Sequence, residues 1–139
     1  SEIEQYRLQS FDVLMTEGGD PDKLGRGAII QNPPKDCIHQ NHIFRVRVDS
    51  SRLLPQYLEE YLQHPKAKKY FLSCAKQTTG IASINMTQLR NLPVLLPRLE
   101  QQKQFSAIVE QIDQHKLTIQ RSLDKMETLK KAMMQQYFD

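Results

Sequence analysis

The sequence predicts an α+β protein, in which a small mixed α/β domain is followed by one long C-terminal helix that pairs in an antiparallel coiled coil. Short apolar segments separated by turn residues fill the first part of the chain, residues 1–97. After Pro97 the chain contains neither glycine nor proline. A seven-residue apolar repeat in this last part is formed by Phe105, Ile112, Ile119, Met126 and Met133. Such a repeat is typical of a helix that packs along another helix.

The N-terminal third predicts three short strands around a glycine-rich loop. Residues 11–15 form an apolar segment, and the loop at 17–27 that follows contains four of the five glycines. Residues 28–30 are the expected returning strand, and the prolines within 32–36 end it. Residues 43–48 alternate apolar and basic side chains, which predicts a strand with one solvent-exposed face.

The middle of the chain predicts helices followed by a loop and a last strand. An apolar face recurs at helical spacing from residue 56 to about 75, and Pro65 is expected to divide this segment into two helices. We expect a polar loop at 77–83, then a short helical turn within 84–92 capped by Asn85 or Thr87. Residues 94–96 are apolar and predict the last strand.

The tail predicts one helix from about residue 100 to 138. Pro97 and Glu100 suit a helix start, and 39 residues would span about 58 Å. A second apolar row accompanies the first and consists of Ile108, Val109, Leu123, Leu129 and Tyr137. An isolated helix of this length cannot bury these rows, so we expect a partner helix. The alternative is the last helix of an ordinary bundle.

The composition excludes several classes of protein. The 139 residues allow one domain with an extension, or a fragment of a larger protein, and no apolar run approaches the 18 residues of a membrane span. No signal-peptide pattern follows Ser1. The two cysteines, Cys37 and Cys74, have no ligand-like spacing, which indicates reduced structural thiols and a cytoplasmic location, with a disulfide between them as the alternative.

The charge distribution indicates an anionic partner. Residues 62–97 contain five Lys and Arg residues and no Asp or Glu, whereas the flanking segments are nearly balanced. An acid-free basic segment is typical of a surface that binds a polyphosphate, although a solvated helix face is the simpler alternative. The expected phosphate contacts are Lys23, Arg26, Lys66, Lys68, Lys69, Lys76 and Arg90. The expected base-reading side chains are Gln77, Thr78, Thr79 and Ser83.

Catalytic and metal-binding patterns are weak. Asn32-Pro33-Pro34 is similar to a motif of adenine methyltransferases, but Lys35 stands where an aromatic residue would stack on the base, and a turn is the better interpretation. The glycine-rich loop lacks the spacing of a phosphate-binding loop. His39 and His42 have no third ligand nearby, so no metal or cofactor is expected.

Several motifs resemble one known family. They are Thr78-Thr79-Gly80-Ile81, Ile84-Asn85, Leu89, the run from Leu92 to Pro97, Leu99-Glu100-Gln101-Gln102 and the tail from Leu129 to Phe138. Together they resemble the end of a target-recognition domain and the conserved helix of the specificity subunit of Type I restriction–modification enzymes. Residues 11–15 with Gly18 also fit this pattern. Arg98 and Gln101 depart from it, because the family often has a second proline and a second acid there.

This resemblance implies a non-catalytic reader of double-stranded DNA. In that family each recognition domain binds half of a split site, and the helices set the distance between the halves and dock the methyltransferase (M) subunits, which work with a restriction (R) subunit. We therefore expect a DNA-binding domain at residues 1–97, incomplete at its N-terminus, and a pairing helix at 98–139. The expected pairing residues are Phe105, Ile108, Ile112, Ile119, Leu123, Met126 and Met133.

Two other hypotheses remain open at this stage. The chain could be an assembly module that pairs with a second copy of itself or with a methyltransferase and binds no DNA. It could also be a fragment of an adenine methyltransferase, which would have to bind S-adenosylmethionine.

Overall fold

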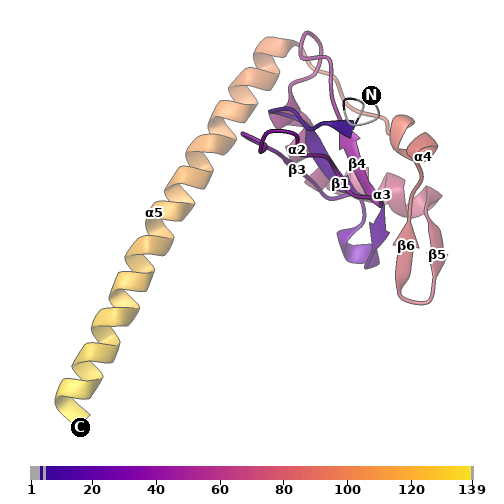
Figure 1. The fold of residues 1–139 in the computed structure, drawn as a ribbon. Helices are drawn as coiled ribbons and strands as arrows, with labels where there is room; N and C mark the ends of the chain where they lie inside the picture. Colours follow the sequence, from indigo (N-terminus) through magenta and orange to yellow (C-terminus); the bar gives the residue numbers. More distant parts are fainter. Residues whose placement is uncertain (1–3, 5, 139) are drawn as a thin grey trace. The chain divides into compact units, whose positions relative to one another are not determined.

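The computed structural model describes residue 4 and residues 6–138, which form two compact units. The first unit is Ser1–Lys103 and the second is Gln104–Asp139. The first contains two small sheets and short helices, and the second consists of the remainder of one long helix (Figure 1). The predicted α+β class is therefore confirmed.

The first sheet has three antiparallel strands in the order β3-β1-β4. Strand β1 (Val13–Thr16) pairs with β3 (Gly27–Ile29) on one side and with β4 (Ile43–Val46) on the other. The side chains of Val13 and Met15 point into the core and are almost fully buried, as expected from the two-residue period of a strand. The three strands predicted around the glycine-rich loop are confirmed.

Two short helices cover this sheet. Helix α2 (Pro55–Gln63) ends before Pro65, and α3 (Pro65–Cys74) begins at that proline, which confirms the predicted division. Proline suits the first turn of a helix because the amide it lacks would have no partner there. Leu58, Leu62 and Phe71 are buried and join the core formed by β1 and β4.

The second sheet contains a hairpin that the sequence analysis described wrongly as a loop. Strands β5 (Lys76–Thr78) and β6 (Ile81–Ser83) are antiparallel, and β6 also pairs with β2 (Gly18–Gly19) from the glycine-rich loop. The turn at Thr79-Gly80 requires a positive φ, and Gly80 adopts +76°. A one-turn helix, η1 (Pro21–Lys23), follows β2.

Helix α4 (Met86–Arg90) is confirmed, with Asn85 as its cap. The Asn85 side chain accepts a hydrogen bond from the Gln88 amide, and the Gln88 side chain accepts one from the Asn85 amide. The strand predicted at residues 94–96 is wrong, because this segment is irregular. Pro93 and Pro97 supply no amide donors at its two ends, which disfavours a ladder.

The ion pair between Asp12 and Arg47 lies beside the first sheet. Asp12 is 1% exposed and accepts hydrogen bonds from Arg47 Nε at 2.7 Å and Nη2 at 2.8 Å. The Gln9 amide also donates to Asp12, at 2.8 Å. Burial raises the pKa of the Asp12 carboxyl, but the hydrogen bonds from Arg47 and Gln9 and the charges of Arg47 and Arg45 outweigh it. The pKa of Asp12 therefore lies below its ordinary value.

The first turn of the long helix α5 (Leu99–Phe138) is fixed to the first unit by Gln102. The side chain of Gln102 is fully buried and accepts a hydrogen bond from the Leu54 amide at 2.9 Å. Its amide group donates to the carbonyl oxygens of Arg52 and Pro97 at 2.9 and 2.8 Å. A buried amide whose two N–H groups and carbonyl oxygen all have partners is well satisfied, so it holds the helix start against the loop before α2.

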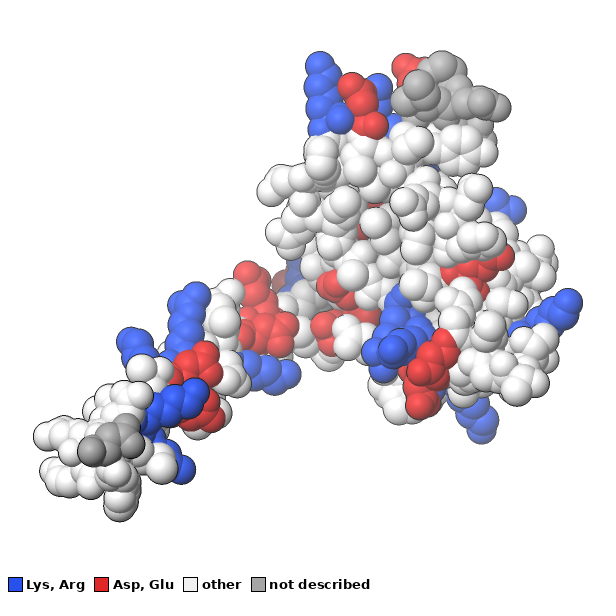
Figure 2. Space-filling view, turned by 60° about the horizontal axis from the view of Figure 1, so that its bottom comes forward, with Lys and Arg blue, Asp and Glu red and all other residues white. Residues whose placement is uncertain are grey.

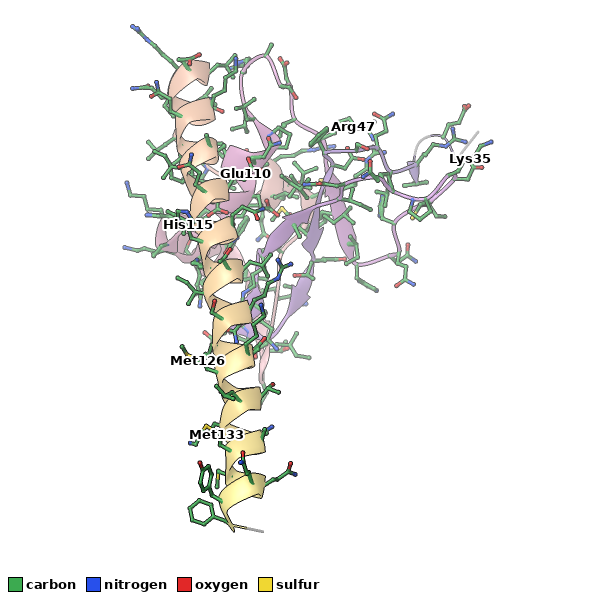
Figure 3. All side chains as sticks on the ribbon, turned by 90° about the vertical axis from the view of Figure 1, so that its left-hand side faces the viewer. Lys35, Arg47, Glu110, His115, Met126 and Met133 are labelled. Carbon is green, nitrogen blue, oxygen red and sulfur yellow. The ribbon has the colours of Figure 1, made fainter. Side chains whose placement is uncertain are left out.

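Helix α5 extends without interruption to Phe138, which confirms the predicted long helix. Its apolar rows are exposed: Ile119 is 68% exposed and Met126 is 69% exposed. Met126 and Met133 point to the same side of the helix, as their seven-residue spacing requires (Figure 3). Among the described residues, no helix combines the length and the apolar character of a membrane span.

Replacing Asp12 by Asn is expected to lower the free energy of unfolding at pH 7 by about 2 kcal/mol, because Arg47 loses its carboxylate partner. A carboxyl whose pKa is lower in the folded than in the unfolded protein stabilises the fold. This stabilisation is complete above the unfolded pKa of about 3.9, and it is lost as the pH falls towards the folded pKa. The variant should therefore lose less stability between pH 5 and pH 3 than the wild type, as measured by urea unfolding. Asp36→Asn, at an exposed pair with Arg7, is the control. Equal acid slopes for Asp12→Asn and the wild type would contradict the prediction.

Replacing Gln102 by Ala is expected to lower the free energy of unfolding of the first unit by about 2–3 kcal/mol, because the buried amide and carbonyl partners lose their hydrogen bonds. Gln104→Ala, two residues further along the helix at an exposed position, should change it by less than about 0.5 kcal/mol. Urea unfolding monitored by tyrosine fluorescence measures both variants. A Gln102→Ala protein as stable as the control would show that these three hydrogen bonds do not hold the helix start.

Candidate functional site

The acid-free segment of the sequence does not form a single helical surface. Lys66, Lys68 and Lys69 lie on α3, as predicted. Lys76 was expected on the same helical segment but lies on β5, because α3 ends at Cys74. Arg90 lies in the last turn of α4. On the face shown in Figure 2, the basic side chains form separate groups, several of them next to acidic side chains.

One of these lysines is paired with an acid from another part of the chain. Lys68 Nζ lies 3.1 Å from Asp22 Oδ1, on η1. The pair is largely exposed, so its contribution to stability is small. Asp22, Arg26 and Lys68 line the same hollow between η1, β3 and α3. The structure thus brings the glycine-rich loop and the basic helix together and partly neutralises Lys68.

The predicted base-reading residues all lie in the β5–β6 hairpin, and the strand pairing gives them different surroundings. Thr78 pairs with Ile81 at the end of the ladder, and Gln77 pairs with Ala82, which is fully buried. Thr78 and Thr79 are exposed. Gln77 donates its side-chain amide to the Leu72 carbonyl at 3.2 Å, and Ser83 is half-buried at the base of the hairpin. Of the four residues, Thr78 and Thr79 are therefore the best placed to contact a ligand.

The base of the hairpin is fixed by hydrogen bonds from the neighbouring helices. The Gln88 side chain donates to the Cys74 carbonyl at the end of α3. The Tyr70 hydroxyl donates to the Gln88 carbonyl at 2.8 Å. Burial, and then the nearby Cys74 thiol, raises the pKa of Tyr70, so its hydroxyl stays protonated and remains a donor. The hairpin is consequently attached to α3 and α4 on one side and to β2 on the other.

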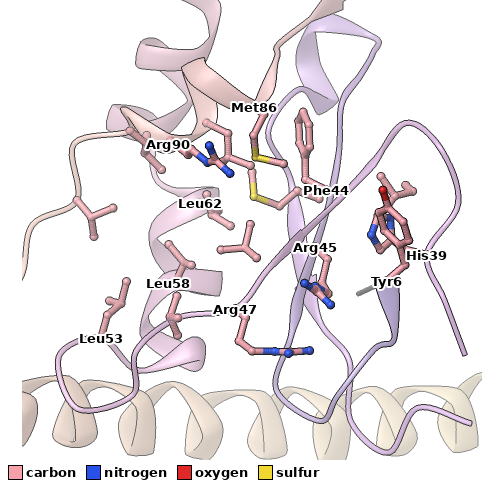
Figure 4. Close-up of a pocket in the computed structure, with 17 residues that line it drawn as sticks. Tyr6, His39, Phe44, Arg45, Arg47, Leu53, Leu58, Leu62, Met86 and Arg90 are labelled. Atoms are coloured by element: carbon pink, nitrogen blue, oxygen red, sulfur yellow. The ribbon is translucent and has the colours of Figure 1, made fainter. Parts of the chain in front are cut away.

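A second hollow, which no sequence pattern predicted, lies beside β4. It is lined mainly by apolar side chains of β4, α2 and α4, including Phe44, Leu58 and Leu62, with Arg45, Arg47 and Arg90 among them (Figure 4). The alternation of apolar and basic residues at 43–48 was the signal for it. Arg47 is committed to Asp12 and Arg45 donates to the Arg7 carbonyl, so two of the three arginines serve the fold.

The remaining candidate motifs form no reaction site. Asn32 has a φ of +51° and is exposed, and residues 35–36 form the turn that follows the two prolines. Lys35, after the two prolines, is also exposed. Within residue 4 and residues 6–138, no group of three or more His, Cys, Asp and Glu side chains gathers as it would around a metal ion. His42 Nδ1 lies 3.0 Å from Glu17 Oε2, and the His39 ring packs edge-on against Tyr6.

The predicted pairing residues form one exposed ridge along α5. Phe105 and Ile108 lie near its start, and Ile112, Ile119 and Leu123 continue it. Met126 and Met133 complete it towards the C-terminus, where Leu129 and Tyr137 are also exposed. Contiguous exposed apolar surface of this kind is unusual for a monomeric protein.

Comparison with known proteins matches residues 1–128 to the family model of the Type I restriction modification DNA specificity domain. The chain is 33% identical, over 99% of its length, to a candidate specificity subunit of the type I restriction enzyme MjaX of Methanocaldococcus jannaschii. It is 28% identical, over 89% of its length, to the specificity subunit of the type I restriction enzyme EcoKI of Escherichia coli. It is 26% identical, over 96% of its length, to that of StySPI of Salmonella potsdam.

The chain spans about a third or less of each relative: 32% of the first, 27% of the second and 29% of the third. The match to the family model nevertheless covers most of the chain and includes both the hairpin and most of α5. The chain therefore belongs to the family of Type I restriction–modification DNA specificity domains.

Proposed function

We propose that this chain is a DNA-recognition module of a Type I restriction–modification enzyme. Residues 1–97 bind one half of a split site in double-stranded DNA, and residues 98–139 form the helix for pairing and methyltransferase docking. The observation that carries this proposal is the exposed hairpin with Thr78 and Thr79, in the same unit as the basic side chains of α3. Hydroxyl groups and lysines are suited to base edges and phosphates, respectively.

In this role the chain selects the DNA site and leaves the chemistry to its partners. The relatives are specificity subunits of type I restriction enzymes. By their likeness, the partners of this chain are methyltransferase and restriction subunits together with double-stranded DNA. No catalytic residue, metal or cofactor of its own is required for such a role.

The exposed ridge supports the pairing of α5 with another helix. Burying one isoleucine or leucine contributes about 1.5–3 kcal/mol, so a ridge that buries several such residues can offset the cost of association. A second copy of this chain is the simplest partner to test. Two antiparallel helices of about 58 Å would span roughly 17 base pairs, enough to separate two DNA-binding units by one helical turn or more.

An assembly module without DNA binding is the second candidate function. The same ridge favours it, because pairing and methyltransferase docking need no contact with DNA. The two candidates differ in what the first unit does, so a direct DNA-binding measurement separates them.

Binding of the chain to duplex DNA is expected to weaken steeply with salt, because lysine contacts release counterions from the phosphates. Lys66→Gln and Lys69→Gln should each weaken binding and reduce the slope of log affinity against log salt by about 1. Lys125→Gln, on the exposed part of α5, is the matched control and should leave the slope unchanged. Fluorescence anisotropy between about 50 and 200 mM salt measures these slopes. An affinity that does not change with salt would rule out the phosphate contacts and favour the assembly module.

Replacing Ile112 and Ile119 together by Asp is expected to convert a self-associated chain into a monomer, because two carboxylates would be buried in the helix pair. The control variant Gln114→Asp with Thr128→Asp adds the same charge at exposed positions away from the ridge and should keep the wild-type mass. Sedimentation equilibrium measures the masses. Equal masses for the wild type and the ridge variant would show that copies of this chain do not pair through the ridge.

A further inference from the structure

The outer face of the β5–β6 hairpin combines polar, apolar and basic side chains in a fixed order. Successive side chains of a strand point to opposite faces, so Lys76 and Thr78 share one face with their cross-strand partners Ser83 and Ile81. Gln77 and Ala82 share the other face, where Ala82 is fully buried and Gln77 bonds to the Leu72 carbonyl. The face that points away from the core thus presents Lys76 near its base and Thr78 with Ile81 near its tip.

Ile81 is the unexpected member of this face. It is 56% exposed at the end of a strand whose next residue, Ala82, is fully buried. Thr78 lies directly across the ladder from it, and Thr79 and Gly80 form the exposed turn. An exposed isoleucine between hydroxyl side chains gives the tip both an apolar contact and hydrogen-bonding groups.

The hairpin is preorganised, which lowers the cost of using it in binding. Strand β6 is held by β2 on its far side, and the Ile84 amide donates to the Glu17 carbonyl at 2.9 Å next to this pairing. The end of α3 and the capped start of α4 hold its base through Gln88. A hairpin fixed in this way loses little conformational entropy when it binds.

We propose that this face of the hairpin enters the major groove of duplex DNA, with Thr78, Thr79 and Ile81 at the base edges and Lys76 at the phosphates of the groove rim. This inference rests on the proposed function, because it requires that the chain bind duplex DNA. The three residue-to-residue steps from Lys76 to Thr79 extend about 10 Å at roughly 3.4 Å per step. The major groove is about 8.5 Å deep and about 12 Å wide and admits a two-stranded ribbon. Lys76 therefore reaches the rim when the tip reaches the floor.

The chemistry of the tip predicts what it reads. An apolar side chain favours the methyl group of thymine, and a threonine hydroxyl donates to or accepts from either type of base pair. Ile81 therefore contributes a preference for thymine at one position of the site. Lys76 contributes affinity without sequence preference, because every base pair has the same phosphates.

The test is selection from a pool of DNA duplexes with a randomised core, using the wild type and single variants of the 139-residue chain. Ile81→Ala and Thr79→Ala should reduce the base preference at one or two positions of the selected sequence. They should also weaken binding to the duplex that the wild type selects by about fivefold or more. Lys76→Gln should weaken binding to all sequences alike and reduce the salt slope by about 1. Thr87→Ala, an exposed threonine on α4, is the control and should select the wild-type sequence.

The results distinguish a failure of the hairpin inference from a failure of the proposed function. If the wild type selects a sequence and the Ile81 and Thr79 variants select it equally well and with equal affinity, the hairpin inference is overturned and the proposed function stands. If the wild type binds no duplex at low salt, both are overturned. Because Ile81 and Thr79 are exposed, their variants should keep the wild-type urea midpoint, which confirms that altered selection is not a loss of folding.

Discussion

The pairing of β2 with β6 is the constraint on which the arrangement of the first unit depends. It joins the glycine-rich loop to a hairpin that lies far along the chain, with Gly18 opposite Ser83. A side chain at Gly18 would place its Cβ 2.9 Å from the Ala82 carbonyl oxygen and from the Ser83 Cβ, so the strands could not approach in this way. The same pairing sets the position of the hairpin and keeps η1 next to α3. The glycine-rich loop and the hairpin tip with its hydroxyl side chains are thus held together by the same sheet.

The elements that the sequence predicts well are those with a long apolar period or a strong local signal. The seven-residue repeat predicted α5, Pro65 divided α2 from α3, and Asn85 capped α4. The β5–β6 hairpin escaped prediction because its strands have three residues each and most of its side chains are polar and exposed. Only Ala82 is buried, so no alternating pattern was long enough to reveal it. The opposite error occurred at residues 94–96, where three apolar residues indicated a strand but bounding prolines removed the donors.

The candidate site shows a second limit, because closeness in sequence is a poor guide to which charges and amides act together. The acid-free segment suggested five free cations, yet Lys68 is paired with Asp22 from the glycine-rich loop. Gln101 and Gln102 are neighbours of the same type, but only Gln102 is buried and binds three backbone groups. Gln77, which was predicted to read bases, also donates its side-chain amide to the Leu72 carbonyl of α3. The Lys68 and Gln102 contacts join segments that are distant in the chain, and no local pattern encodes them.

The ridge on α5 is uneven in a way that bears on the proposed pairing. The first apolar row, from Phe105 to Met133, has an apolar residue at every seventh position. The row that begins at Ile108 has His115 and Ser122 at its next two positions before it becomes apolar again at Leu129. A continuous row favours many registers equally, whereas polar residues at defined positions of a seam favour registers that leave them solvated or paired. In the proposed helix pair, the first row supplies apolar contacts along its whole length, including Ile112 and Ile119, and the polar positions His115 and Ser122 restrict how the two helices align.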